Sequence, residues 1–263
     1  MTRPPPRSRR TPLASWPEKG SGLGLGSIFK ETAGRAGLLS RPPAFPPREA
    51  VPRGSGQGVL VIPGFLTGDI TTRRLRTFLT RSGYHAEGWK GGINLGPRAK
   101  PIQRLKSRVE KLVEVTGGKV VLAGVSLGGV FAREVAKMMP DHVAGVATLC
   151  SPIRLPVPTP LAPFVTALQR TFDQGLVDGA LGEPVMPEQP MLVVFSKDDG
   201  VVDWRTCVPP ARDTITVLDL PGARHMTIGS NPEAQEALGI FLSRVFPARV
   251  VPPRGEADNL RAP

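Results

Sequence analysis

The stretch from Lys119 to Met139 reads KVVLAGVSLGGVFAREVAKMM, and it decides the fold. Its apolar start, residues 120–122, predicts a buried strand, and its second half is rich in residues that favour helices. A G-x-S-x-G pattern occupies residues 124–128 between the two. A strand, a tight turn and a helix in this order are the setting in which such a serine is exposed as a nucleophile. We therefore predict a strand-to-helix turn with Ser126 at its tip.

Small residues are needed on both sides of this serine. Gly124 and Gly128 let the strand and the helix approach each other without a clash of Cβ atoms. Ser126 also precedes a helix, and the free N–H groups and the dipole at a helix N-terminus favour a developing negative charge. An incidental serine in a glycine-rich connection is the alternative interpretation. The strand before the pattern and the helix after it favour the functional one.

Length and composition indicate one α/β domain with tails. The chain has 263 residues, of which 40% are hydrophobic, and this is enough for a sizeable core. The net charge is +12, but much of the excess of basic over acidic residues lies in the first fifty positions, and only 5% of residues are aromatic. No base-stacking platform is indicated, so we expect no specific nucleic-acid partner. The basic N-terminal segment would allow weak peripheral contact with an anionic membrane.

Composition also divides the chain into three parts. Residues 1–57 are rich in Pro and Arg, and we expect them to be a largely disordered extension. Residues 58–247 should form the α/β domain, and residues 248–263 a flexible tail. No signal peptide is evident and no apolar run approaches the ~20 residues that span a bilayer, so we expect a cytoplasmic protein. The two cysteines, Cys150 and Cys207, form no disulfide framework; a single bridge between them is the alternative, and two free thiols are the default expectation.

Apolar runs and amphipathic segments alternate along the domain. Strands are expected at 59–62, 85–89, 120–122, 143–149, 191–195 and 214–218, and helices at 71–82, 102–116, after the central serine, and from Asn231-Pro232 to 245. Such alternation predicts a mostly parallel sheet inside a three-layer α/β/α sandwich. The Pro-rich segment 151–189 interrupts it and is too long for a plain loop, so we expect a functional segment or a small cap insertion.

A serine nucleophile needs a base, and the chain offers three histidines. His85 precedes the serine at the start of a strand, and His142 should emerge at the opposite end of the sheet. His225 lies in a loop after the last strand, at the carboxyl edge that also carries Ser126. Position and elimination therefore select His225 as the base.

The acid should lie between the serine and the histidine in the chain. Three aspartates follow the strand at 191–195. Asp199 is favoured because Gly200 after it allows a sharp turn and two valines can be buried beneath it. Asp198 is the near rival and Asp203 the more distant one. Turn formation or helix capping would explain any of the three without catalysis.

A tetrahedral intermediate needs backbone N–H donors. The residue after the nucleophile, Leu127, should supply one of them. The loop after the first strand should supply the second, and we choose Phe65, with Leu66 as the alternative. Pro63 is excluded because proline has no N–H.

These motifs resemble the α/β-hydrolase superfamily, most closely its small bacterial lipase- and esterase-type members. The resemblance covers about residues 59–245 and rests on the serine motif, on Pro63-Gly64-Phe65, on the turn at Asp199-Gly200 and on His225. It implies the α/β-hydrolase fold and hydrolysis of carboxylic esters, with no metal and no organic cofactor. Many such lipases carry His-Gly where this chain has Pro-Gly; the glycine turn is kept, but the contacts of that histidine are lost.

We therefore expect a serine esterase or lipase that forms an acyl-enzyme intermediate. Two other functions stay open: an acyltransferase or thioesterase with the same triad, and an inactive domain that binds a lipid or partner. Apolar side chains including Leu66, Leu155 and Phe164 are expected to bind the substrate. Those of the cap could equally bury the cap on the core.

Overall fold

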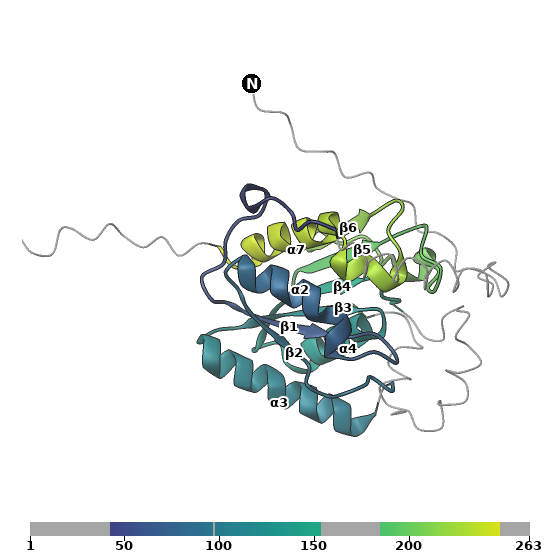
Figure 1. The fold of residues 1–263 in the computed structure, drawn as a ribbon. Helices are drawn as coiled ribbons and strands as arrows, with labels where there is room; N and C mark the ends of the chain where they lie inside the picture. Colours follow the sequence, from purple (N-terminus) through teal and green to yellow (C-terminus); the bar gives the residue numbers. More distant parts are fainter. Residues whose placement is uncertain (1–42, 97, 154–184, 248–263) are drawn as a thin grey trace, which may run out of the picture.

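A computed structural model of the chain describes residues 43–96, 98–153 and 185–247 (Figure 1). Six strands in these ranges form one sheet in the order β2-β1-β3-β4-β5-β6, and every neighbouring pair is parallel. The strands are β1 (Gly58–Ile62), β2 (His85–Gly88), β3 (Val120–Val125), β4 (Val143–Leu149), β5 (Met191–Phe195) and β6 (Ile215–Asp219). The predicted parallel sheet is confirmed.

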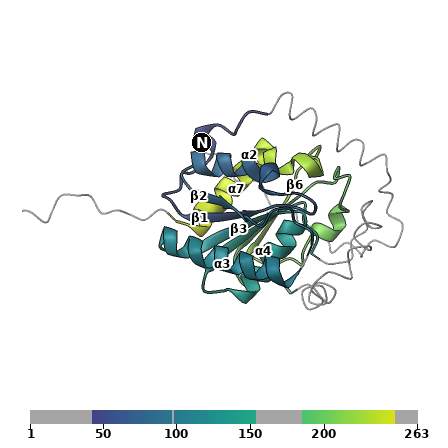
Figure 2. The same cartoon turned by 60° about the horizontal axis from the view of Figure 1, so that its bottom comes forward.

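Helices cover both faces of the sheet, as Figure 2 shows. They are α2 (Asp69–Arg81), α3 (Ala99–Thr116), α4 (Leu127–Met138) and α7 (Pro232–Val245). One apolar core joins α2 and α7 to one face, and a second core joins α3 and α4 to the other. The three-layer α/β/α sandwich expected from the sequence is therefore confirmed.

Strand β1 shows why the sheet is buried on both sides. Val59 and Val61 point into the core under α2 and α7, whereas Leu60 and Ile62 point into the core under α3 and α4. All four side chains are fully buried. The sequence of a central parallel strand is therefore a continuous apolar run. Burial of each such side chain contributes about 1.5–3 kcal/mol to stability.

Most expected elements lie within two residues of their observed bounds. Two elements differ by three residues: helix α3 begins at Ala99 rather than at the expected residue 102, and β3 extends to Val125 rather than to the expected residue 122. Pro101 stands in the first turn of α3, where a missing N–H costs no intrahelical bond. Helix α7 begins as expected: the Asn231 side chain accepts hydrogen bonds from the N–H groups of Glu233 and Ala234.

The packed part of the chain begins before the expected domain boundary at residue 58. Phe45 stacks on Phe78 of α2, with a distance of 6.5 Å between ring centroids. Val51 is buried against α7, where a Cβ on Gly239 would lie 2.1 Å from its Cγ1 atom. Residues 43–57 are thus part of the described domain. The N-terminal residues 1–42, most of the expected cap (154–184) and the tail 248–263 lie outside the described residues.

Within the described ranges, no helix is both long and apolar enough to cross a lipid bilayer.

Candidate active site

The carboxyl ends of all six parallel strands meet at one edge of the sheet. Each candidate residue that the structure describes follows one of these strands. Phe65 and Leu66 follow β1, Ser126 and Leu127 follow β3, Asp199 follows β5, and His225 follows β6. Four loops that are distant in sequence therefore bring the candidate nucleophile, acid, base and oxyanion donors to the same edge.

Ser126 stands between β3 and α4 in a backbone conformation that L-residues rarely adopt, with φ 52° and ψ −126°. Holding a residue in such a conformation costs on the order of 1–3 kcal/mol. Its N–H donates to the carbonyl of Leu149 at 2.9 Å, so the turn is tied to β4. A Cβ on Gly124 would lie 2.2 Å from the carbonyl oxygen of Gly128. The predicted tight strand-to-helix turn is present, and it requires glycine on both sides of the serine.

Asp199 and His225 form a buried pair. The Asp199 Oδ2 atom lies 2.7 Å from the His225 Nδ1 atom, and their side chains are 2% and 6% exposed. The other oxygen, Oδ1, accepts hydrogen bonds from the N–H groups of Val201 and Val202, both at 2.8 Å. These bonds fix the carboxylate, which in turn fixes the orientation of the imidazole ring.

The environment of Asp199 keeps it ionised. Burial alone would raise the pKa of the carboxyl group. The positive charge of His225 and the hydrogen bonds from His225, Val202 and Val201 outweigh this effect, so the pKa of Asp199 is lowered. An ionised Asp199 can accept the Nδ1–H of His225 and leaves Nε2 as the basic nitrogen.

The two competing aspartates have other partners. The Asp198 Oδ2 atom accepts a hydrogen bond from the N–H of Gly222 at 2.7 Å. The Asp203 side chain caps the short helix η3 (Trp204–Cys207) by accepting the N–H of Arg205. Both have the turn-forming or capping roles that were the alternative to catalysis. Of the three aspartates, Asp199 is therefore the one whose carboxylate contacts His225.

The other two histidines lie away from this group. His85 begins β2, and its exposed ring contacts Glu87 at 3.3 Å. His142 directly precedes β4, so it lies at the amino edge of the parallel sheet, as expected.

The loop after β1 packs beside the nucleophile. A Cβ on Gly64 would lie 3.2 Å from the Cβ of Ser126. The N–H of Leu66 already donates to the carbonyl of Asn94 at 2.8 Å, which removes Leu66 as the alternative oxyanion donor. Leu127 is the first residue of α4, where N–H groups have no intrahelical acceptor. Phe65 and Leu127, the pair chosen from the sequence, stay the predicted oxyanion donors.

Of the expected substrate-binding residues, the structure describes Leu66. Its side chain is 40% exposed, next to the candidate oxyanion loop. Leu155 and Phe164 lie outside the described residues.

Sequence reasoning missed the surroundings of Cys150. This fully buried cysteine forms no disulfide and follows β4, and its sulfur lies within 4.8 Å of a carboxylate oxygen of Asp199 and a ring nitrogen of His225. These are groups that bind transition metals. Both oxygens of Asp199 already accept hydrogen bonds, so the observed geometry is that of an acid–base pair with a thiol beside it. The position of Cys150 at a strand's carboxyl end was the available signal.

Cys207 is also free and buried, which confirms the expectation of free thiols. Burial and the nearby charge of Asp199 raise the pKa of its thiol well above the usual value. This cysteine therefore stays neutral in the interior.

No protein-family model and no curated protein matches the sequence. Solved structures do match. A metagenome-derived lipolytic enzyme, from the study of LipS and LipT, has a TM-score of 0.54 at 18% identity, covering 73% of this chain and 96% of its own. The pyrethroid hydrolase PytH has a TM-score of 0.51 at 19% identity, covering 74% of this chain and 99% of its own. Together with the sheet order and the turn at Ser126, these likenesses show that the chain has the α/β-hydrolase fold.

Proposed function

We propose that this protein is a serine hydrolase that cleaves carboxylic esters. The observation that carries the proposal is the buried 2.7 Å contact between Asp199 and His225, at the sheet edge where the strained Ser126 turn also lies. A nucleophile, an acid and a base in this chain order are what the fold uses for acyl transfer. The similar structures of a lipolytic enzyme and a pyrethroid hydrolase agree with hydrolysis as the class of reaction.

In the proposed reaction, the Ser126 Oγ atom attacks the ester carbonyl carbon while its proton passes to Nε2 of His225. The ionised Asp199 stabilises the imidazolium that forms. The carbonyl oxygen becomes an oxyanion, which accepts hydrogen bonds from the N–H groups of Phe65 and Leu127. Collapse of this intermediate breaks the ester C–O bond, and the alcohol leaves with the proton from His225.

Deacylation repeats these steps with water. His225, again neutral, takes a proton from water as its oxygen attacks the acyl carbon. The second tetrahedral intermediate breaks the bond to Ser126, whose Oγ recovers the proton from His225. The products are a carboxylic acid and the restored serine.

The test compares the wild type with Ser126→Ala on p-nitrophenyl butyrate. Loss of the nucleophile should lower kcat by roughly 10⁴-fold or more. Ser107→Ala is the matched control, because Ser107 is exposed on α3 and should keep wild-type activity. Undiminished hydrolysis by Ser126→Ala would overturn the proposal.

The same assay, extended from acetate to palmitate esters, distinguishes an esterase from a lipase. An esterase should prefer short, soluble esters. A lipase should keep its activity on long chains and gain activity above the solubility limit of the substrate. A chain-length profile therefore decides between them.

A further inference from the structure

Asn94 is a fully buried polar residue in the loop between β2 and α3. Its side-chain Nδ2 donates to the carbonyl of Pro63 at 2.9 Å, across 31 residues of sequence. Its Oδ1 accepts the N–H of Gly96 at 3.1 Å. Burying an amide is unfavourable unless its groups are paired, and here one amide joins its own loop to the loop after β1.

The backbone of Asn94 makes two more bonds to the loop after β1. Its carbonyl accepts the N–H of Leu66 and its N–H donates to the carbonyl of Thr67, both at 2.8 Å. Together with the bond to Pro63, these contacts bracket Gly64 and Phe65 on both sides. One residue therefore holds both ends of the segment that carries the proposed oxyanion donor.

The bracketed segment needs such support because its backbone is strained. Leu66 has a φ of 57°, a left-handed conformation that costs a residue with a Cβ roughly 1–2 kcal/mol. Thr67 helps from within the turn, since its hydroxyl donates to the carbonyl of Gly64 at 2.8 Å. The bonds to Asn94 offset the remaining strain from outside the turn.

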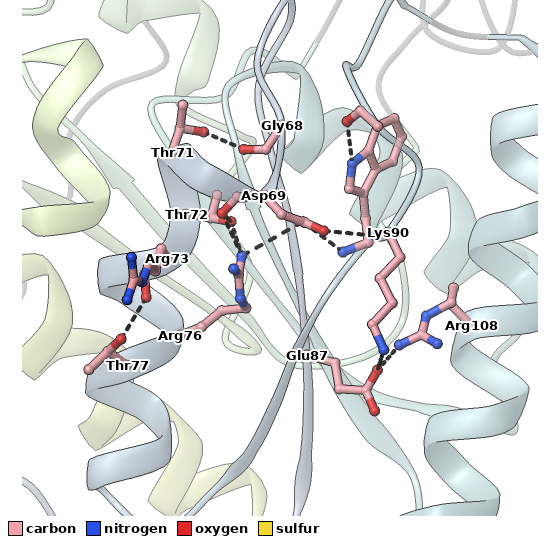
Figure 3. A network of polar contacts seen from close by, with 12 residues as sticks. Gly68, Asp69, Thr71, Thr72, Arg73, Arg76, Thr77, Glu87, Lys90 and Arg108 are labelled. Carbon is pink, nitrogen blue, oxygen red and sulfur yellow. Dashed lines mark hydrogen bonds and ion pairs between the residues drawn. The ribbon is translucent and has the colours of Figure 1, made fainter.

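Asp69 anchors the other end of the Asn94 loop. Figure 3 shows its carboxylate beside the backbone of Lys90. Its carboxylate oxygens accept the N–H groups of Trp89 and Lys90, both at 3.1 Å. The Trp89 indole then donates to the carbonyl of Gly92 at 2.9 Å. The loop is thus fixed before it reaches Asn94, so Asn94 can act as a rigid support.

We infer that Asn94 is a positioning residue that sets the geometry of the oxyanion hole. It does not touch the substrate; it acts through Pro63 and Leu66 on the orientation of the Phe65 N–H. The inference rests on the proposed function, because the oxyanion hole is part of it. Removal of one oxyanion donor costs about 10²–10³ in kcat, so a displaced donor should cost less, about 10–10²-fold.

Two variants separate the amide's hydrogen bonds from its volume. Asn94→Ala removes both side-chain bonds. Asn94→Asp keeps the shape and the acceptor for Gly96 but removes the donor to Pro63. If the donor matters, both variants should lose kcat by about 10–10²-fold with KM changed less than about threefold, as expected for an interaction made in the transition state.

Gln189→Ala is the matched control. The Gln189 amide also donates to a backbone carbonyl, that of Ala136 at 3.3 Å, but it does so at the opposite edge of the sheet. Fluorophosphonate labelling taken to its end point gives the fraction of folded sites for every variant. Rates divided by that fraction are then free of any effect of unfolding, and the control should match the wild type.

The decisive readout is the affinity of a trifluoromethyl ketone, which forms an oxyanion on the serine. Its Ki should rise in both Asn94 variants by about the factor by which kcat/KM falls, and should not rise in Gln189→Ala. If both Asn94 variants have the kcat and Ki of the wild type after correction for the fraction of folded sites, the inference is overturned. A wild-type protein that hydrolyses no ester and takes no label would instead overturn the proposed function.

Discussion

Replacement of Gly128 by alanine tests whether the turn at Ser126 and the oxyanion loop are held in contact. A Cβ at this position would lie 2.3 Å from the carbonyl oxygen of Ile62 and 2.6 Å from that of Pro63. Because Cβ atoms essentially never lie closer than 3.0 Å to another heavy atom, the backbones must separate by about 0.7 Å. Overpacking of this kind costs about 1–3 kcal/mol of stability.

The same displacement should reduce activity. It separates the segment leading to Phe65 from the helix that begins at Leu127, and these two residues are the proposed oxyanion donors. A misplacement of 1 Å costs about 10²-fold in rate, so Gly128→Ala should lower kcat/KM by about 10–10²-fold. The assay is p-nitrophenyl butyrate hydrolysis, corrected for active sites, with urea unfolding in parallel.

Gly118→Ala provides the control. An added Cβ there meets no heavy atom within 4 Å, and the residue has no positive φ. It should therefore change neither the activity nor the free energy of unfolding by a measurable amount. Wild-type activity and stability in Gly128→Ala would contradict the close contact between the helix and the loop after β1.

Three further predictions follow from individual contacts. Asp199→Asn should lower kcat by about 10⁴-fold, because His225 loses the acceptor that fixes its tautomer, whereas Asp198→Asn should cost less than about tenfold; steady-state kinetics compare them. The pKa of Asp199 is lower in the folded protein than its usual value of 3.8. The ionised carboxylate therefore stabilises the fold fully at a pH above 3.8, and this stabilisation is lost as the pH falls through the lowered pKa of the folded state. Urea unfolding from pH 6 to pH 2 should therefore show that the difference in the free energy of unfolding between wild type and Asp199→Asn becomes smaller as the pH falls. A difference that stays constant with pH would contradict this role of the carboxylate. Asn231→Ala should lower the free energy of unfolding by about 1 kcal/mol without changing kcat, because α7 loses its N-cap; an unchanged urea midpoint would argue against that role.

The fold was predictable because the strands are long apolar runs separated by amphipathic helices. The strands at 143–149 and 191–195 lie at the predicted residues, since a buried parallel strand carries its signal on every side chain. The sequence also indicated which aspartate contacts His225. The turn that favoured Asp199 is the one in which its carboxylate accepts the N–H groups of Val201 and Val202.

Other features depend on contacts between distant segments and leave no local pattern. Asn94 lies in a glycine-rich loop without periodicity. Its hydrogen bond to Pro63 joins two loops that are 31 residues apart, so it could be identified from the folded structure but not from the sequence. The Pro-rich composition before residue 58 predicted disorder, yet Val51 packs against α7 at Gly239, where the absence of a side chain leaves room for it. Composition describes the average behaviour of a segment and does not reveal a specific docking site on the folded domain.

The location of a covalent adduct tests the proposed role of Ser126. The intact wild type is treated with a fluorophosphonate, digested and mapped by mass spectrometry, in parallel with Ser126→Ala. We expect one adduct on the wild type, at Ser126 in the turn between β3 and α4, and none on the variant. A folded wild type that takes no label, or a label on another residue that persists in Ser126→Ala, would contradict that role.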